Sequence, residues 1–441
     1  MRSSLVSHFR LASVGTFAVS MAAIIAACSS SSSGGNNNAD DGGGSPGTDG
    51  SVINPDKDGG NNPGADGGLP ITDGGGGKDS GPGSMDAGPP GPRYVGRIAV
   101  NGTDVTCDWP GCRAIAKFHG TAASISIGGS LGSSNYDVIV DGVVTKQIVV
   151  NAANAANPFV LASGLPLADH TVEIYKRTEG NDGIETFHPF TFPNGGVVLS
   201  PPLPGKHLIE FIGDSITAGF GVEGTGGDPG NCDNQPLIDT LTNVHKSFAA
   251  ITAANVSSDA IFVAASGKGV TRNFNPSDTQ LLIGNTDATQ DLYGMTKVDD
   301  GAQTWLFKPL PDAVVIALGA DDFNNPGAGT TPTQAQFQAA YKALIVKVRA
   351  KNPTAYIFAT YSPSIQDLGM MAGDPNNGLT ICKAAIPVAV TSLNDAKVFY
   401  VDNIPNASMA DGTGCLQHPN AAYHANVATS LTGFIKTKTG W

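Results

Sequence analysis

Five short apolar segments in the second half of the chain constrain its fold more strongly than any other feature of the sequence. All of them follow His207, and they read LIEFIG, AIFVAAS, AVVIALG, YIFATYS and VFYVD. Continuous apolar runs of this length are typical of strands that are buried on both faces of a parallel sheet. Helical patterns lie between them. The sequence therefore predicts a three-layer α/β/α domain with a ligand site at the carboxyl ends of its strands.

Two segments show the spacing of an amphipathic helix. Between residues 333 and 350 one apolar stripe is formed by Phe337, Tyr341, Leu344, Ile345 and Val348. One helix face requires this spacing of three and four, and Thr331-Pro332 just before it is a start signal. A second stripe predicts a final helix and is formed by Val427, Leu431, Phe434 and Ile435.

Residues 94–200 follow a different pattern. Short or alternating apolar runs recur between turn signals such as Asp141-Gly142, without helical periodicity. Many short strands of this kind predict an all-β sandwich. We place the sandwich at residues 93–203 and the α/β domain at residues 204–441, with the Pro-rich segment SPPLPGK as a stiff connector.

The first 28 residues have the pattern of an export signal. Arg2 and Arg10 are followed by an apolar run that is rich in small residues and ends at Cys28. This order predicts a lipoprotein signal peptide, with Cys28 as the lipid-carrying first residue after cleavage. A plain transmembrane anchor is the alternative, for which the run is short. We therefore expect an exported protein, anchored by lipid to the bacterial cell envelope at the outer membrane or cell surface.

Residues 29–92 consist mainly of Ser, Gly, Asn, Asp and Pro, with almost no apolar side chains. Such a segment cannot bury enough surface to offset the entropy of ordering, so a disordered linker is predicted. It contains nine Asp and two Lys residues and so carries more than half of the net charge of −13. Since the remainder is only mildly acidic and has no basic patch, no nucleic-acid role is expected. No aspartate spacing matches a calcium loop.

Six cysteines occur in the chain, and export permits disulfide bonds. The short spacing of Cys107 and Cys112 suggests a local bridge. We predict a second bridge between Cys382 and Cys415, which would join two loops of the α/β domain and leave Cys232 over. No CxxC pair indicates a zinc site, so no metal is expected.

Polar groups follow several of the predicted parallel strands. The segment GDSITAG places Ser215 at the start of a helix, where backbone N–H groups can stabilise an oxyanion; a helix N-cap is the alternative role. Gly267 follows the next strand and allows a close backbone approach. Asp321 follows the third, and His418 lies in the last loop. A hydroxyl, a backbone donor, a polar side chain and an imidazole are the groups that acyl transfer needs.

The segments GDSITAG, SGKG, GADD and HPN occur in this order and resemble the signature blocks of the SGNH (GDSL) hydrolases. With the leading sandwich, residues 94–441 are similar to the family 2 carbohydrate esterases. These enzymes remove acetyl groups from plant polysaccharides and carry a jelly-roll domain before the SGNH domain. The resemblance implies a serine esterase without metal or cofactor that acts on acetylated polysaccharides or oligosaccharides such as xylan or glucomannan.

The resemblance also implies roles for individual residues. Ser215 would be the nucleophile and His418 the general base. Oxyanion donors would be the backbone N–H groups of Ser215 and Gly267 and a side chain of the third block. Asp214 and Asp322 would support the site.

Two positions depart from the family pattern. Asp321 stands where the third block normally has Asn, and an ionised carboxylate would repel an oxyanion. Its pKa would have to rise by about 3 pH units from its usual ~3.9, so a slower or acid-favouring enzyme is expected. Before His418, Leu416 occupies the acid position, so we expect a backbone carbonyl to hold the Nδ1–H group. Asp411 is an alternative partner, and His424 is a rival base.

Further residues and functions stay open. Trp305 resembles a family aromatic and is a candidate substrate-binding residue, although a core position is the stronger expectation. Trp109 is expected to belong to the packing of the sandwich or to its edge, and Arg272 and Asn273 to brace the site. An SGNH lipase or thioesterase and an inactive glycan-binding lipoprotein are the alternative functions.

Overall fold

The structure is a computed structural model of the chain. It describes residues 89–441 except 130–131, 156, 181–184, 226–231, 233–234, 276, 284–291, 299–303, 325–330, 368–375 and 406–411. The predicted signal peptide with Cys28, the predicted linker and Asp411 lie outside the described residues.

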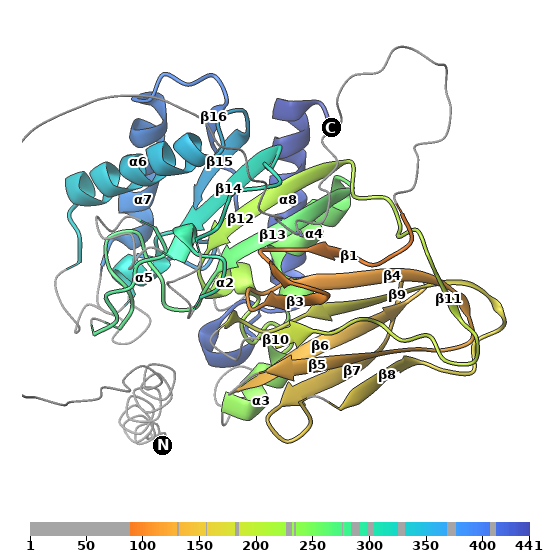
Figure 1. Cartoon of the computed structure of the whole chain (residues 1–441). Coiled ribbons are helices and arrows are strands. Elements are labelled where there is room, and N and C mark those ends of the chain that lie inside the picture. The colour runs from red at the N-terminus through yellow and green to blue at the C-terminus, as the bar shows by residue number, and fades with distance from the viewer. Residues whose placement is uncertain are drawn as a thin grey trace, which may run out of the picture. The chain divides into compact units, whose positions relative to one another are not determined.

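The first half of the described chain forms two antiparallel sheets (Figure 1). One has the order β1 (Arg93–Val95), β4 (Arg113–Gly120), β9 (Ala168–Lys176), β6 (Ser133–Val140) and β7 (Val143–Asn151), with β11 (Val197–Leu199) also paired to β4. The other has the order β2 (Ala99–Asn101), β3 (Asp104–Cys107), β10 (Glu185–Phe187), β5 (Ala123–Gly129) and β8 (Pro158–Ala162). Alternating burial along β3 and β5 reflects one face packed on the core.

The second half contains a parallel sheet, as the five apolar segments predict. Its order is β13 (Ser258–Ala264), β12 (His207–Gly213), β14 (Ala313–Leu318), β15 (Tyr356–Tyr361) and β16 (Val398–Tyr400). Neighbouring strands are parallel throughout this path. The chain adds β13 on one side of β12 and β14 on the other, so the strand order reverses between β12 and β14. In α/β sheets of this order the ligand site lies at this switch point.

Helices cover both faces of the parallel sheet. Figure 1 shows α6 (Gln334–Lys351) and α7 (Gly378–Thr391) on one face and α4 (Phe248–Asn255) and α8 (Ala421–Thr439) on the other. Shorter helices are α2 (Ser215–Ala218), α3 (Gln235–Leu241) and α5 (Ala320–Phe323). The two predicted helices are confirmed as α6 and α8. Thr333 caps α6, since its hydroxyl accepts a hydrogen bond from the Gln336 N–H at 3.3 Å.

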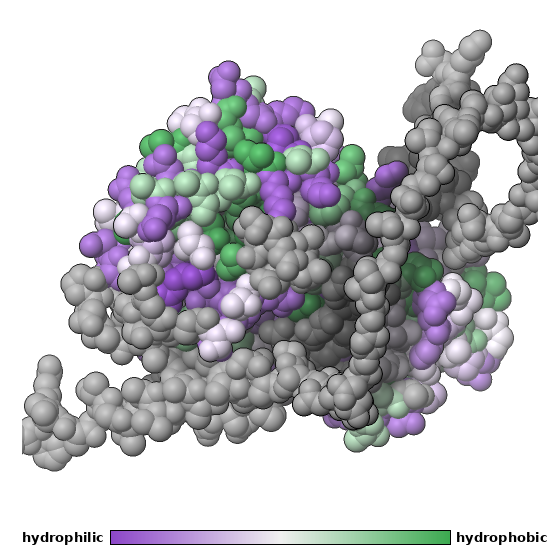
Figure 2. All heavy atoms as spheres, turned by 60° about the vertical axis from the view of Figure 1, so that its left-hand side comes forward, coloured by the Kyte–Doolittle hydropathy of each residue, from purple (hydrophilic) through white to green (hydrophobic). Residues whose placement is uncertain are grey.

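The face of the α/β part seen in Figure 2 is of mixed polarity. Figure 2 shows hydrophilic side chains interspersed with smaller hydrophobic groups on the face in view. In the part of the chain that the structure describes, no helix is long and apolar enough to cross a membrane.

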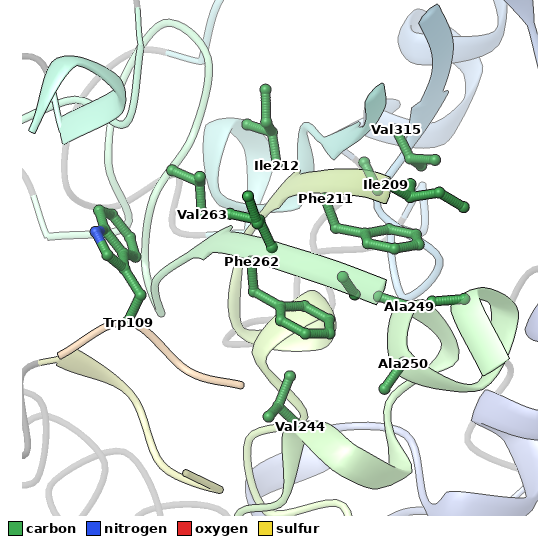
Figure 3. Packing of buried hydrophobic residues seen from close by; sticks show 14 of the residues in the cluster. Trp109, Ile209, Phe211, Ile212, Val244, Ala249, Ala250, Phe262, Val263 and Val315 are labelled. Carbon is green, nitrogen blue, oxygen red and sulfur yellow. The ribbon is translucent and has the colours of Figure 1, made fainter. Parts of the chain in front are cut away.

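One continuous core joins the sandwich to the parallel sheet. Figure 3 shows part of it, with Phe211 and Phe262 on adjacent strands. Their ring centroids are 5.7 Å apart. The turn CDWPGC presses on this layer: a Cβ atom at Gly111, which has φ +73°, would collide with the Phe262 ring. Trp109 is fully buried, and its Nε1–H donates to the Thr296 carbonyl at 3.0 Å. The turn therefore fastens the sandwich to the α/β part.

Arg97 of the sandwich is buried in this core. Its guanidinium donates to Glu210 of β12 at 2.9 Å and lies within 6.0 Å of the ring centroids of Trp109, Tyr293, Trp305 and Phe307. Trp305 is only 9% exposed. It therefore occupies the core position that the sequence favours, packed against Arg97.

The structure confirms one predicted disulfide bond and corrects the other. Cys107 and Cys112 are bonded, with Cα atoms 6.4 Å apart. The predicted Cys382–Cys415 bond is wrong, because Cys415 is bonded to Cys232, whose Cα lies 5.5 Å away. Cys382 is a free, buried thiol on α7, packed behind the Gly319 turn.

Candidate active site

Ser215 is the first residue of helix α2, which follows β12 at the point where the strand order reverses. Asp214 caps this helix, and its Oδ1 accepts a hydrogen bond from the Ile216 N–H at 3.0 Å. The turn is tight, since a Cβ atom on Gly213 would collide with the Thr217 side chain. The hydroxyl of Ser215 is thereby fixed at the start of a helix, where the first N–H groups have no partner within the helix.

His418 lies next to Ser215, although 203 residues separate them in the sequence. Its Nε2 is 2.8 Å from Ser215 Oγ, and its Nδ1 is 2.9 Å from the backbone oxygen of Leu416. A carbonyl only accepts hydrogen bonds, so Nδ1 carries the proton and Nε2 is left to accept one from the hydroxyl. Burial lowers the pKa of His418, which keeps the imidazole neutral and able to act as a base near neutral pH.

The backbone around Leu416 adopts an unusual conformation to make this contact. Leu416 and Gln417 both have positive φ angles, of 48° and 62°. Two consecutive non-glycine residues in this region are strained, and such strain persists only where surrounding contacts impose it. Here the Cys415 N–H donates to the Gly221 carbonyl at 3.0 Å, and the Cys232–Cys415 bond ties the same residue to a distant segment.

The Leu416 side chain takes no part in orienting the histidine. It is buried in a small apolar cluster with Cys232, Ile238 and Cys415. The expected backbone carbonyl is therefore found at Nδ1, and the residue at the family's acid position contributes its main chain instead of its side chain.

The rival base His424 is engaged elsewhere. Its Nδ1 accepts a hydrogen bond from the Phe248 N–H at 3.0 Å, and its ring is stacked with Phe248. Burial lowers its pKa to about 3, so it stays neutral and structural.

Gly267 lies in the loop after β13, as expected, with a φ angle of +76° that favours glycine. Its carbonyl accepts a hydrogen bond from the Phe274 N–H at 2.8 Å. Asn273 braces the same loop, with its Oδ1 accepting from the Gly269 N–H at 3.3 Å. The loop is thus closed on itself and presents its backbone at the carboxyl end of the sheet.

Asp321 lies on the first turn of α5, and its carboxyl group is buried. Oδ2 has no hydrogen-bond partner among the residues that the structure describes. Burial, followed by the negative charges of Asp214, Asp322 and Glu179, raises its pKa well above the usual value, while Arg272 opposes this shift. The environment thus favours the protonated form, in which a carboxyl group can donate a hydrogen bond to an oxyanion.

Asp322 connects two of the loops. Its carboxylate accepts hydrogen bonds from the Val270 N–H at 2.8 Å, the Thr271 N–H at 2.6 Å and the Thr271 hydroxyl at 2.5 Å. Burial raises the pKa of Asp322, and that of Asp214 to about 7. The hydrogen bonds of Asp322 hold the loop that carries Gly267, and Asp214 caps the helix that carries Ser215.

One residue of the site escaped sequence reasoning. Glu179 of the sandwich accepts hydrogen bonds from the N–H and the hydroxyl of Ser266, the residue before Gly267. Burial raises the pKa of Glu179, and the two bonds from Ser266 oppose this. The only local signal was a charged segment directly after a strand, which usually indicates a solvated turn.

Among the described residues, no group of three or more His, Cys, Asp or Glu side chains is placed to hold a metal ion.

Comparison with known proteins identifies both halves. Residues 94–202 match the family model of the carbohydrate esterase 2 N-terminal domain, and residues 211–426 match that of the GDSL-like lipase/acylhydrolase family. Cellulase/esterase CelE of Acetivibrio thermocellus is 35% identical over 356 residues, which are 80% of this chain and 40% of CelE. The acetylxylan esterase/glucomannan deacetylase of Cellvibrio japonicus is 25% identical over 373 residues, which are 81% of this chain and 94% of that enzyme.

Solved structures agree with these matches. The structure of a family two carbohydrate esterase from Clostridium thermocellum in complex with cellohexaose superimposes with a TM-score of 0.69 at 33% identity, covering 80% of this chain and 100% of that one. An active-site mutant of a family two esterase from the same organism gives the same TM-score at 34% identity, covering 99% of that chain. This chain therefore belongs to family 2 of the carbohydrate esterases, which are carboxylic ester hydrolases built from an SGNH domain preceded by a β-sandwich.

Proposed function

We propose that this protein removes acetyl groups from plant-type polysaccharides or oligosaccharides through an acyl-enzyme on Ser215. The observation that carries the proposal is the alignment of Ser215 Oγ, the His418 ring and the Leu416 carbonyl through contacts of 2.8 and 2.9 Å. A hydroxyl, a neutral imidazole and an acceptor that fixes its tautomer are the parts of an activated serine nucleophile.

The first half of the reaction forms the acyl-enzyme. As Ser215 Oγ attacks the acetyl carbonyl carbon, its proton passes to His418 Nε2, and the carbonyl π electrons move to the oxygen. When this tetrahedral oxyanion collapses, the bond to the sugar oxygen breaks, and that oxygen takes the proton from His418. The sugar leaves with a free hydroxyl group, and the acetyl group stays on Ser215.

Water completes the cycle by the same steps. His418 takes a proton from the water as its oxygen attacks the acetyl carbon, and then returns a proton to Ser215 Oγ. Acetate is released and both residues are restored.

Three donors are proposed for the oxyanion. The backbone N–H groups of Ser215 and Gly267 are two of them, and the protonated carboxyl group of Asp321 is the third. The burial and raised pKa of Asp321 support this assignment. Loss of one such donor typically lowers kcat by about 10²–10³-fold, so ionisation of Asp321 would slow the enzyme without abolishing catalysis.

The carbohydrate substrate is supported by the relatives. The Cellvibrio japonicus relative is named an acetylxylan esterase and glucomannan deacetylase. The Clostridium thermocellum structure contains cellohexaose, a linear chain of sugars. An acetylated β-linked polysaccharide is therefore the substrate class that we propose for this chain.

The place of action is proposed from the sequence. The pattern that ends at Cys28 indicates a lipid anchor on the bacterial envelope, from which the enzyme would reach glycans outside the cell. Labelling of cells with a fatty acid should mark the wild-type protein but not Cys28→Ser.

The test of the activity compares wild type with Ser215→Ala on p-nitrophenyl acetate, followed by acetate release from acetylated xylan, glucomannan and other glycans. Ser258→Ala serves as a control, because Ser258 lies at the amino end of β13, whereas the loop that carries Gly267 follows its carboxyl end. We expect the wild type and the control to be active and Ser215→Ala to be inactive. Equal rates in all three would reject the esterase and leave a glycan-binding protein. Faster hydrolysis of p-nitrophenyl esters with long acyl chains than of the acetate would favour a lipase.

A further inference from the structure

Glu179 belongs to the sandwich but contacts the α/β part next to the candidate oxyanion site. It lies three residues after the end of β9, and its side chain is buried. Oε2 is 2.6 Å from the Ser266 nitrogen, and Oε1 is 2.5 Å from Ser266 Oγ. One carboxylate therefore holds both the main chain and the side chain of a residue that is 87 positions away in the sequence.

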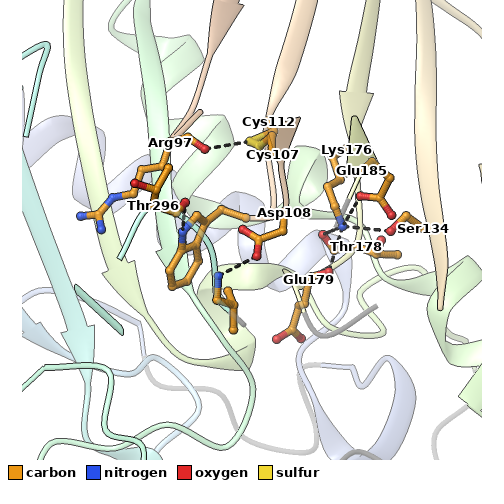
Figure 4. Close-up of a disulfide and its surroundings, with 12 residues drawn as sticks. Arg97, Cys107, Asp108, Cys112, Ser134, Lys176, Thr178, Glu179, Glu185 and Thr296 are labelled. Carbon is orange, nitrogen blue, oxygen red and sulfur yellow. Dashed lines mark hydrogen bonds and ion pairs between the residues drawn. A yellow bond between two sulfur atoms is a disulfide. The ribbon is translucent and has the colours of Figure 1, made fainter. Parts of the chain in front are cut away.

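The segment that carries Glu179 is itself firmly held. Lys176 Nζ donates to the Glu179 carbonyl at 2.9 Å and to Ser134 Oγ at 3.0 Å, and it pairs with Glu185 at 3.7 Å. Figure 4 shows the Glu179 carboxylate pointing away from the Lys176 amine. At the next residue, a Cβ atom on Gly180 would lie only 2.5 Å from a methyl carbon of Val298. The carboxylate thus projects from a backbone with little room to shift.

The contact with Ser266 restrains the peptide that follows. The N–H of Gly267 belongs to the peptide group between residues 266 and 267. On one side Glu179 fixes Ser266, and on the other the Gly267 carbonyl accepts the Phe274 N–H at 2.8 Å. The direction of the Gly267 N–H is therefore set by contacts on both sides, and one of them comes from the sandwich.

We propose that Glu179 is a positioning residue for ester hydrolysis, through which the sandwich domain aims the Gly267 N–H at the oxyanion. The inference rests on the proposed function. It assigns the sandwich a part in building the catalytic centre, because the carboxylate acts through Ser266 and does not itself touch the reacting atoms.

Three substitutions at position 179 distinguish the effect of side-chain length from the effect of negative charge. Glu179→Gln keeps the length of the side chain: its oxygen can accept from the Ser266 N–H, while its amide donates to the hydroxyl. Glu179→Asp keeps the charge, but its carboxylate is withdrawn by one methylene. Glu179→Ala removes the contact. If the position of the carboxylate is what matters, Glu179→Gln should keep kcat within about threefold of wild type. Glu179→Asp and Glu179→Ala should lower kcat by about 10–10²-fold, which is less than the ~10³-fold upper value for loss of an oxyanion donor.

The control is Glu173→Gln, which changes a glutamate of β9 that pairs with Arg113 at 3.4 Å and has no part in holding Lys176 or Glu179. We would measure kcat and KM with p-nitrophenyl acetate at mildly acidic pH, together with the melting temperature of each variant. We expect Glu179→Asp and Glu179→Ala to have a lower kcat and a KM near that of wild type. The control should change only the melting temperature.

Several results would overturn the inference. They are a kcat for Glu179→Asp equal to or above that of Glu179→Gln, or full kcat in all three variants, or a loss in Glu179→Gln as large as in Glu179→Ala. These outcomes refute the role of Glu179 while Ser215-dependent turnover of the wild type stands. Absence of that turnover in the wild type would instead refute the proposed function, and the inference with it.

Discussion

The loop that carries His418 and the loop that carries Asp321 depart from one family pattern in opposite directions. In the first, a carboxylate is missing, since Leu416 occupies the acid position. In the second, a carboxylate is present where an amide is usual. In the first loop the main chain takes the place of the missing acid, because the Leu416 carbonyl oxygen lies 2.9 Å from Nδ1 of His418. The second relies on burial, which favours the protonated acid.

This difference decides where the enzyme is sensitive to pH. A backbone carbonyl does not titrate, so the orientation of His418 is the same at every pH at which the loop is folded. A carboxyl group donates only while it is protonated. The alkaline limit of activity should therefore be set by Asp321, and the acid limit by His418, whose pKa is lowered by burial.

The largest effect is expected from removal of the base. His418→Ala should lower kcat by about 10⁴-fold or more, because proton transfer from Ser215 is lost. The control is His424→Asn, whose amide oxygen can replace Nδ1 as the acceptor for the Phe248 N–H. That variant should keep most of the wild-type kcat in the p-nitrophenyl acetate assay. Similar losses in the two variants would contradict the assignment of the base.

The second prediction concerns the extra carboxylate. In the wild type, activity should fall as pH rises through the raised pKa of Asp321, since the protonated donor is present only below it. Asp321→Asn donates at all pH values and should remove this fall, giving up to about 10²-fold higher kcat on the alkaline side. On the acid side the two should be similar. Parallel pH profiles of kcat would show that Asp321 does not act as a donor.

The third prediction compares the two disulfide bonds. Replacing Cys232 and Cys415 by Ser should lower the free energy of unfolding by about 2–4 kcal/mol. It should also lower kcat by about tenfold, because the Leu416 carbonyl is less well fixed. Replacing Cys107 and Cys112 should lower stability without a comparable loss of kcat. If both pairs change only stability, the Cys232–Cys415 bond has no role in orienting His418. Chemical denaturation and steady-state kinetics provide the two measurements.

The smallest effect is expected at Leu416 itself. Leu416→Ala keeps the carbonyl that His418 uses, so kcat should change by less than about threefold, or under ~1 kcal/mol. The melting temperature should fall, since an apolar side chain is lost from the cluster with Ile238. Leu241→Ala is the control, because Leu241 is a partly buried side chain that packs against the same cluster from outside the loop. A much larger loss of kcat in Leu416→Ala than in the control would mean that the side chain, and not the main chain, orients the base.

The parts of the fold that local pattern determines could be predicted from the sequence. Each apolar run became a strand of the parallel sheet, and the stripe ending at Val348 became α6. These features depend on neighbouring residues only. The closeness of Ser215 and His418 was expected from the family resemblance, since no periodicity relates residues 203 positions apart.

Pairings between distant segments could not be predicted in the same way. Cys232 and Cys382 both lie far from Cys415 in the sequence, and only the three-dimensional path of the chain shows that Cys232 meets it, across 183 residues. The contact of Glu179 with Ser266 is of the same kind. Its partner is set by how the sandwich packs on the sheet, and nothing near Glu179 in the sequence specifies that packing.

The burial of Arg97 has a consequence for how such proteins can be recombined. Arg97 lies before the connector at residues 200–206, whereas Glu210, Tyr293 and Phe307, which it contacts, lie after it. Leaving one partner of a buried ion pair alone typically destabilises a protein by about 3–5 kcal/mol. An exchange of one half for that of an unrelated protein would thus have to replace the ion pair too. We therefore expect recombination between genes to transfer the sandwich and the α/β part together.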